Sequence, residues 1–128
     1  MKDSPIWDSL PALLAALGLD GEPRRGLVGE DEVAVREGLF AVLSALGHSV
    51  DAREGIEREG LPLVCDAAFL DNYFLSSTLT GVSLTPELVR ANSQVRVLAM
   101  SSDPGKNAEM VRLGASLAIS KSALRRLF

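Results

Sequence analysis

Five polar residues each follow a short apolar run in this sequence. Three are acids, Glu30, Asp31 and Asp71, and the other two are Ser101 and Lys121. Neighbouring carboxylates repel one another, so they must share a cation or have raised pKa values. Mg²⁺ fits such a set best, because it takes hard oxygen ligands and is usually held by one or two carboxylates together with phosphate oxygens.

The remaining residue types suit a phosphoryl group bound beside that metal. The Lys121 ammonium would neutralise a transferring phosphoryl group, and the Ser101 hydroxyl would hydrogen-bond one of its oxygens. Asp71 is then the natural nucleophile, forming an acyl phosphate. The sequence has one histidine and one cysteine, so it offers no cluster of the kind that binds zinc.

These side chains meet only if the fold brings them together, and the apolar pattern predicts such a fold. Short apolar runs predict strands over residues 26–29, 49–52, 67–70, 95–100 and 117–120. Helical periodicity follows the first strand and ends at Gly47, whereas residues 53–65 give no clear signal. The residues on the inner face of that helix are Val35, Leu39, Val42, Leu43 and Leu46.

Two further helices are predicted from their first residues. Thr85 and Pro86 are expected to supply the N-cap and first turn of a helix through Arg90. Asp103 and Pro104 open the next helix, which is expected to turn Met110 and Leu113 inward and to end at Gly114. Strands and helices therefore alternate along the chain, five times over.

Such alternation predicts an α/β fold, a doubly wound five-stranded parallel sheet with helices on both faces. Right-handed crossovers put the C-terminal end of every strand at one edge of the sheet, where ligands bind in such folds. The five polar residues all fall at that edge. This convergence is the strongest inference from the sequence.

An extra amphipathic helix is predicted ahead of the first strand. We expect residues 1–20 to form this N-terminal helix and residues 25–128 to form the α/β domain. An exposed row of leucines favours association. We therefore expect the helix to pack either on its own domain or on a second copy, as a homodimer contact. Its apolar residues recur at helical spacing and are Ile6, Leu10, Leu13, Leu14 and Leu17.

Composition excludes several classes of function. A formal net charge of −4 does not suit a nucleic-acid surface, and no apolar run reaches the length of a membrane span. The first residues lack the pattern of a secretory signal, so we expect a cytoplasmic protein. The single cysteine, Cys65, is interpreted as a packing residue.

Four short motifs, taken in their order along the chain, resemble those of the receiver domains of bacterial response regulators, and the resemblance covers residues 25–124. Asp31 precedes Asp71 by 40 residues, Asp71 precedes Ser101 by 30, and Ser101 precedes Lys121 by 20. The order and spacing together are more specific than any one motif. The motifs are Gly29–Glu32 followed by an amphipathic helix, Phe69–Asp71, Val97–Ser102 and Gly114–Lys121.

The resemblance implies a sheet of strand order 2-1-3-4-5 and a role for each site residue. Asp71 matches the phosphoacceptor, and Glu30 and Asp31 match the acidic pair, of which Asp31 should bind Mg²⁺ directly. Tyr73 matches the position whose backbone carbonyl completes the metal site and whose side chain tunes dephosphorylation. Catalytic roles also fall to two further residues, Ser101 and Lys121.

The same resemblance implies partners. A histidine kinase or phosphotransfer protein would supply the phosphoryl group, and an unidentified downstream protein would be contacted in turn. Any enzymatic activity would be limited to self-phosphorylation and self-dephosphorylation of Asp71.

Three departures from the family pattern keep a second interpretation open. Ala118 stands where a switch aromatic is usual, Ser122 replaces the proline after the lysine, and Leu75 replaces a loop proline. A degenerate receiver, acting as a non-switching interaction module, is therefore the alternative. A phosphatase of the haloacid-dehalogenase type ranks last, because it needs Asp-x-Asp where this chain has Glu30 to Glu32.

Four remaining residues are given ordinary structural roles. Glu32 is interpreted as a solvated residue at the strand edge, and His48 as a solvated turn residue after a helix-ending glycine. Trp7 and Tyr73 are expected to pack rather than to stack on a ligand.

Overall fold

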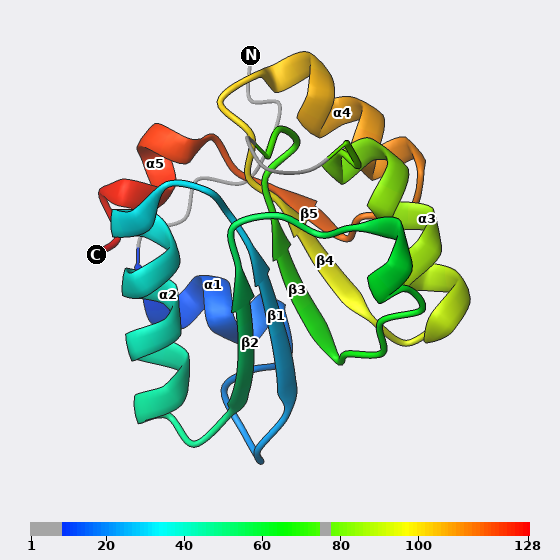
Figure 1. Ribbon diagram of the computed structural model, residues 1–128. Helices are drawn as coiled ribbons and strands as arrows, with labels where there is room; N and C mark the ends of the chain where they lie inside the picture. Colours follow the sequence, from blue (N-terminus) through cyan, green and yellow to red (C-terminus); the bar gives the residue numbers. More distant parts are fainter. Residues whose placement is uncertain (1–8, 75–77) are drawn as a thin grey trace.

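The computed structural model describes residues 9–74 and 78–128. Its centre is a five-stranded, all-parallel sheet in the order β2-β1-β3-β4-β5, which confirms the predicted fold class and strand order (Figure 1). Each strand boundary lies within two residues of the predicted one. The strands are β1 (Arg25–Gly29), β2 (Ser49–Arg53), β3 (Ala67–Leu70), β4 (Arg96–Ala99) and β5 (Leu117–Ala118).

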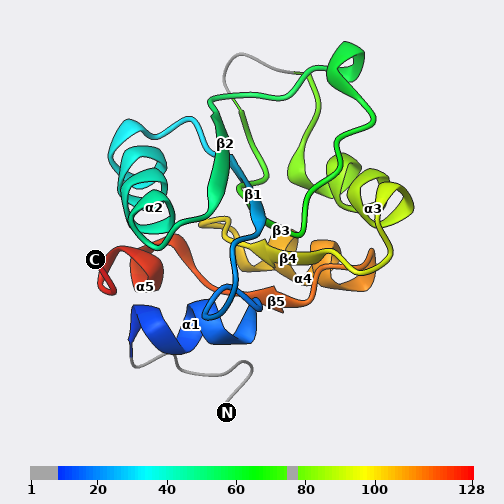
Figure 2. The same ribbon diagram turned by 90° about the horizontal axis from the view of Figure 1, so that it is seen from below.

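Helices cover both faces of this sheet. Helices α1, α2 and α5 lie on one face, and α3 and α4 lie on the other (Figure 2). Among residues 9–74 and 78–128, no helix is long and apolar enough to cross a membrane. The helices are α1 (Leu10–Ala16), α2 (Val33–Ala45), α3 (Gly81–Ala91), α4 (Pro104–Arg112) and α5 (Lys121–Arg125).

The alternation of strand side chains divides the apolar core into two clusters. Val28, Phe69 and Leu98 contribute to the cluster beneath α1, α2 and α5. Their strand neighbours Ala68 and Val97 belong to the cluster beneath α3 and α4. Because both faces are covered, every residue of β3 is buried. Such doubly buried strands explain why the sequence shows continuous apolar runs rather than alternation.

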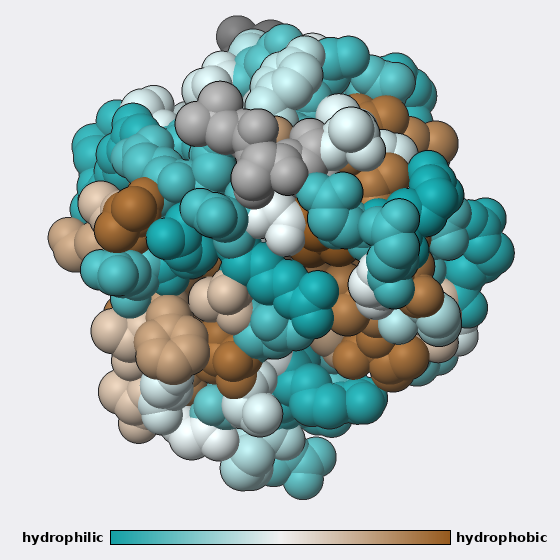
Figure 3. Space-filling view, viewed as in Figure 1, coloured by the Kyte–Doolittle hydropathy of each residue, from teal (hydrophilic) through white to brown (hydrophobic). Residues whose placement is uncertain are grey.

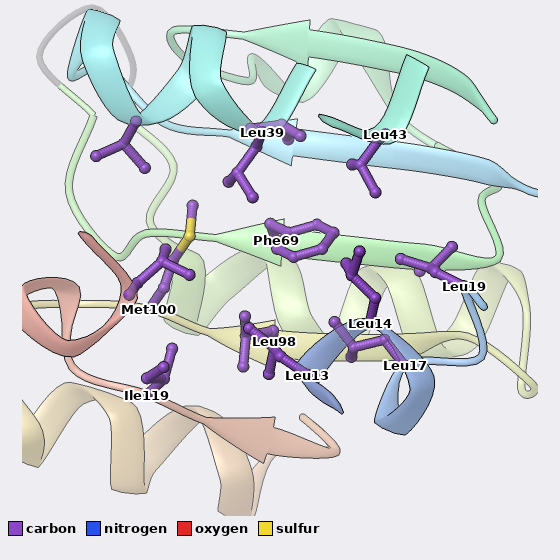
Figure 4. Close-up of a cluster of buried hydrophobic side chains, with 14 residues drawn as sticks. Leu13, Leu14, Leu17, Leu19, Leu39, Leu43, Phe69, Leu98, Met100 and Ile119 are labelled. Atoms are coloured by element: carbon purple, nitrogen blue, oxygen red, sulfur yellow. The ribbon is translucent and has the colours of Figure 1, made fainter. Parts of the chain in front are cut away.

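Helix α1 packs on its own sheet. Its N-cap Ser9 accepts a hydrogen bond from the Ala12 N–H (3.3 Å), and Gly18 takes a positive φ of 73° just after the helix ends. Leu13, Leu14 and Leu17 are buried in the same cluster as Phe69 and Leu98 (Figure 4). In Figure 2, α1 lies beside the short α5. Of the residues assigned to this helix from the sequence, Ile6 lies outside the described part of the chain, as does Trp7.

The second crossover differs from the prediction. All of residues 54–66 are described, and between β2 and β3 they form one short 3-10 turn (η1, Arg58–Gly60) and no α-helix. The expected fivefold alternation is therefore wrong at this point. Buried Ile56 and Cys65 cover this part of the sheet instead, while Val64 is exposed. Figure 3 shows apolar side chains at the surface between β2 and α3.

Helix α3 begins earlier than predicted. Its N-cap is Thr80, whose hydroxyl accepts the Ser83 N–H (3.2 Å), while the Ser83 hydroxyl accepts the Thr80 N–H (3.0 Å). Thr85 is the fifth residue of the helix, and its hydroxyl donates to the Gly81 carbonyl (2.7 Å). Pro86 therefore lies inside the helix. The reciprocal cap at Thr80 outweighs the bond that Pro86 cannot donate.

The inner faces of two helices are narrower than predicted. In α4, Met110 is fully buried, but Leu113, just after the helix, is 40% exposed. In α2, Val35, Leu39 and Leu43 are buried, whereas Leu46 is exposed. The exposed leucines in both cases are the C-cap residues, where the chain leaves the helical path that would have turned them inward.

The edge of the sheet where the strands begin, here called the linker edge, holds three polar side chains that bond to backbone groups. His48 is only 6% exposed, so its prediction as a solvated residue is wrong. Its Nδ1 accepts the Arg24 N–H (3.0 Å) and its Nε2 lies 2.8 Å from the Leu19 carbonyl, which requires a neutral ring with the proton on Nε2. Arg96 donates to the carbonyl of Ala16 (3.0 Å).

Asp66 is the third of these side chains. Its carboxylate accepts the backbone N–H of Arg25 (2.8 Å) and pairs with the Arg25 guanidinium (3.3 Å). The N–H of Asp66 donates in turn to the Arg25 carbonyl (2.9 Å). The linker edge is thus fastened by contacts between side chains and backbone.

Candidate functional site

The opposite edge, here called the site edge, gathers the predicted residues. Glu30 follows β1, Asp71 follows β3, and Lys121 begins α5 after β5. Because the strands are parallel and adjacent, their C-terminal ends meet there (Figure 1). The Asp71 N–H continues the ladder by donating to the Gly29 carbonyl (3.0 Å), which fixes the nucleophile candidate beside β1.

A buried ion-pair cluster forms the centre of the site. The Lys121 ammonium donates to Asp71 Oδ2 and to Glu30 Oε2, the latter at 3.1 Å. Glu30 is 0% exposed, Asp71 6% and Lys121 7%. Groups of both signs are therefore held away from water, where their interactions are strong and their desolvation is costly.

Burial changes the proton affinity of this cluster. Desolvation raises the pKa of Glu30 to about 7, against the opposing effects of the Glu32 N–H and of Lys121. For Lys121, burial disfavours the charged form, but hydrogen bonds to Asp71 and Glu30 outweigh it and raise the pKa above its ordinary value. The lysine therefore stays charged at neutral pH.

The acidic residues fit a hard divalent cation. Glu30, Asp31 and Asp71 each offer one carboxylate oxygen, and these oxygens lie within 4.8 Å of one another. In the described part of the chain, Glu30 Oε1 is buried without a hydrogen-bond partner, although the Lys121 ammonium lies 3.0 Å away. A set of carboxylate oxygens, one of them buried without a hydrogen-bond partner, suits a hydrated Mg²⁺ or Ca²⁺ better than zinc.

Asn72 and Gly81 hold the loop after Asp71. The side-chain oxygen of Asn72 accepts the Val82 N–H (3.0 Å), and the backbone carbonyl of Asn72 accepts the Gly81 N–H (2.8 Å). A Cβ at Gly81 would collide with the Asp71 carbonyl oxygen, so the start of α3 can approach the site only with glycine at that position. Sequence reasoning missed both residues, because their partners are backbone groups.

The chain is similar to known proteins in solved structures, but not in the family-model and curated-sequence comparisons. No protein-family model and no curated protein sequence matches this chain. Among solved structures, the receiver domain of NtrX from Brucella abortus matches with a TM-score of 0.62 and 25% identity, over 78% of this chain and 89% of that one. A CheY-like receiver domain from Methanospirillum hungatei JF-1 matches with a TM-score of 0.63 and 18% identity, over 83% and 91%.

The chain has the receiver fold. The resemblance found in the sequence is thereby confirmed. A response regulator from Burkholderia pseudomallei with a phosphorylated aspartic acid and a calcium ion also matches, with a TM-score of 0.64, 18% identity, and 82% and 66% of the two chains covered. A longer NtrX structure matches with a TM-score of 0.67 and 24% identity over 81% of this chain, which spans a quarter of that protein's length.

Within the receiver fold, Ser101 is brought to the site edge and buried, 2% exposed. Its hydroxyl accepts the Asp103 N–H at the start of α4 (3.0 Å). Sequence reasoning missed Asn107, whose buried carboxamide contacts the backbone of Ser101. Its spacing of three residues from Met110, on the same helix face, is the one signal in the sequence that could have found it.

Three other residues that the sequence analysis discussed, Tyr73, Ala118 and Glu32, differ in their exposure and contacts. Tyr73 is 58% exposed, so its prediction as a packing residue is wrong. Ala118 is half-buried in β5 and carries no ring. Glu32, half-exposed as expected, pairs with Arg125 of α5, with Arg125 Nε 3.1 Å from Glu32 Oε1. That pair lowers the pKa of Glu32 and ties the start of α2 to α5.

Proposed function

We propose that this chain is a phosphoacceptor receiver domain that is phosphorylated on Asp71 with the help of Mg²⁺ and signals through protein contacts. The observation that supports it best is the buried contact of Lys121 with both Asp71 and Glu30, beside an orphaned carboxylate oxygen. A histidine kinase or phosphotransfer protein would be the donor, and the protein would act in the cytoplasm.

The proposed reaction transfers a phosphoryl group to a carboxylate oxygen of Asp71. The new oxygen–phosphorus bond forms as the bond between phosphorus and the donor's leaving atom breaks, and the leaving group keeps that electron pair. Glu30, Asp31 and Asp71 would hold Mg²⁺, with the Tyr73 carbonyl, and the metal would supply charge neutralisation when bound. Lys121 would follow the phosphoryl oxygens, and Ser101 would donate its hydroxyl to one of them.

The test is the intact mass of the protein after incubation with Mg²⁺ and a small phosphodonor such as acetyl phosphate. We expect a gain of one phosphoryl group that disappears in Asp71→Asn. Asp51→Asn is the matched control, because Asp51 is an exposed aspartate paired only with Arg53 in the contacts described. It should take the phosphoryl group as the parent does.

The second candidate is a degenerate receiver that binds a partner without being phosphorylated. The observation in its favour is Ala118, because a receiver without a ring at that position cannot use a rotating aromatic to report its state. If the parent chain gains no phosphoryl group under these conditions, the degenerate receiver replaces the first proposal.

A further inference from the structure

Asn107 connects three parts of the receiver fold through one side chain. It lies in α4 and is 6% exposed. Its Oδ1 accepts the Ser101 N–H (2.8 Å), and its Nδ2 donates to the Ser101 carbonyl (3.0 Å) and to the Ile119 carbonyl (3.3 Å). One carboxamide thus joins the loop after β4, the body of α4 and the segment after β5.

The two contacts to Ser101 make the coupling stiff. The Asn107 side chain bonds to both the N–H and the carbonyl of Ser101, as a neighbouring strand would. Ser101 therefore cannot shift without moving α4 or breaking two hydrogen bonds. The Ser101 hydroxyl also accepts the N–H of Asp103, the N-cap of α4. A hydroxyl that turned toward a phosphoryl group would leave that contact.

The third contact reaches the lysine side of the site. Ile119 donates its own N–H to the Ala99 carbonyl (2.9 Å) and stands two residues before Lys121. A displacement of Asn107 would therefore reach the start of α5 through a backbone carbonyl, without any ring at position 118.

We propose that Asn107 is the positioning residue that carries the phosphorylation state of Asp71 from Ser101 to α4 and to the Ile119–Lys121 segment. This inference rests on the proposed function, because it supplies the output route for the same site. It also accounts for a buried polar side chain in a helix that is otherwise short and polar.

A second asparagine provides the matched control. Asn92, after α3 near the linker edge, also joins two backbone segments: its Nδ2 donates to the Cys65 carbonyl (2.9 Å) and its Oδ1 accepts the Gln94 N–H (3.1 Å). Asn92→Ala therefore removes a comparable structural contact far from Asp71. Asn107→Ala removes the proposed coupling as well.

The experiment compares backbone amide shifts with and without Mg²⁺ and beryllofluoride, a phosphoryl analogue, in the full chain. In the parent and in Asn92→Ala, we expect shifts near Asp71, along α4 and at Ile119. In Asn107→Ala, the shifts near Asp71 should remain, while those along α4 and at Ile119 should disappear. Thermal unfolding checks that the two variants lose similar stability.

Two results would overturn the inference, and they are distinguishable. Unchanged propagation in Asn107→Ala would remove Asn107 from the route while leaving phosphorylation of Asp71 intact. A parent chain that shows no shift at Asp71 would overturn the proposed function, and the inference with it. If Asn107→Ala does not fold, the side-chain amide resonances of Asn107 in the parent decide the question, because they must move when beryllofluoride binds.

Discussion

At the site edge, the charged groups of Glu30, Asp71 and Lys121 are buried in contact with one another. At the linker edge, by contrast, the His48 ring is neutral, and the side chains of Arg96 and Asp66 bond to backbone groups. At the site edge, Glu30 Oε1 is buried without a hydrogen-bond partner. At the linker edge, both ring nitrogens of His48 have one. Buried ion pairs add little net stability, but removing one partner is costly. The site edge therefore fits the ligand site that we propose, and the contacts of the linker edge hold the chain.

The largest expected effect is at the site edge. Lys121→Ala leaves two buried carboxylates without their cation, and we expect the free energy of unfolding to fall by ~3–5 kcal/mol in urea titration. Lys106→Ala is the control, because Lys106 pairs with Glu109 at 3.4 Å on a partly exposed helix surface. It should cost under ~1 kcal/mol. Equal losses in the two variants would contradict the contrast between buried and exposed pairs.

The next effect separates stability from chemistry at the linker edge. His48→Ala leaves the Leu19 carbonyl and the Arg24 N–H without their partner, so we expect a loss of ~2 kcal/mol in the free energy of unfolding. Transfer of a phosphoryl group to Asp71 should be unchanged when followed by intact mass. Loss of transfer in a folded His48→Ala protein would show that the two edges are not independent.

A smaller effect sharpens the metal assignment. Mg²⁺ at ten times its dissociation constant should raise the free energy of unfolding by ~1.4 kcal/mol, because it binds the folded site. Asp31→Asn removes one of the three clustered carboxylates and should abolish this gain, whereas Asp51→Asn should keep it. Stabilisation that survives in Asp31→Asn would place the metal elsewhere.

The smallest effect is a pH dependence at the linker edge. Hydrogen bonds from the backbone and side chain of Arg25 hold the pKa of Asp66 below its ordinary value of 3.8. Its contribution to stability is present above pH 3.8 and is lost as the pH falls through the lowered pKa. Asp66→Asn should therefore flatten the acid limb of the stability curve. An unchanged slope would mean that other carboxylates dominate it.

The sheet was predictable because its signal is local. Apolar runs such as residues 67–70 are buried on both faces, and their lengths set the strand boundaries. The start of α3 was not predictable in the same way. Thr85 and Pro86 form a strong local signal for the start of a helix. The N-cap is nevertheless Thr80, because Gly81 allows the helix to approach the Asp71 backbone.

The site was predictable in the polar residues that follow the strands, Ser101 included. Parallel topology forces Glu30, Asp31, Asp71 and Lys121 to one edge, whatever the details of the loops. The roles of Asn107 and His48 depend on backbone carbonyls up to 29 residues away in the chain, and such partners leave no pattern in the sequence.

Helix α1 is synthesised well before some of the residues that it packs against. Its leucines share a cluster with Leu98, Ile119 and Leu124, and the Ala16 carbonyl is held by Arg96, 80 residues later. At ~5–20 residues per second, that separation means roughly 4–16 s of synthesis before Arg96 is even joined to the chain. Until then the leucines of α1 can contact earlier members of the cluster, such as Leu39 and Phe69, but not Leu98, Ile119 or Leu124, so this helix is fully covered only after Leu124 has been joined to the chain.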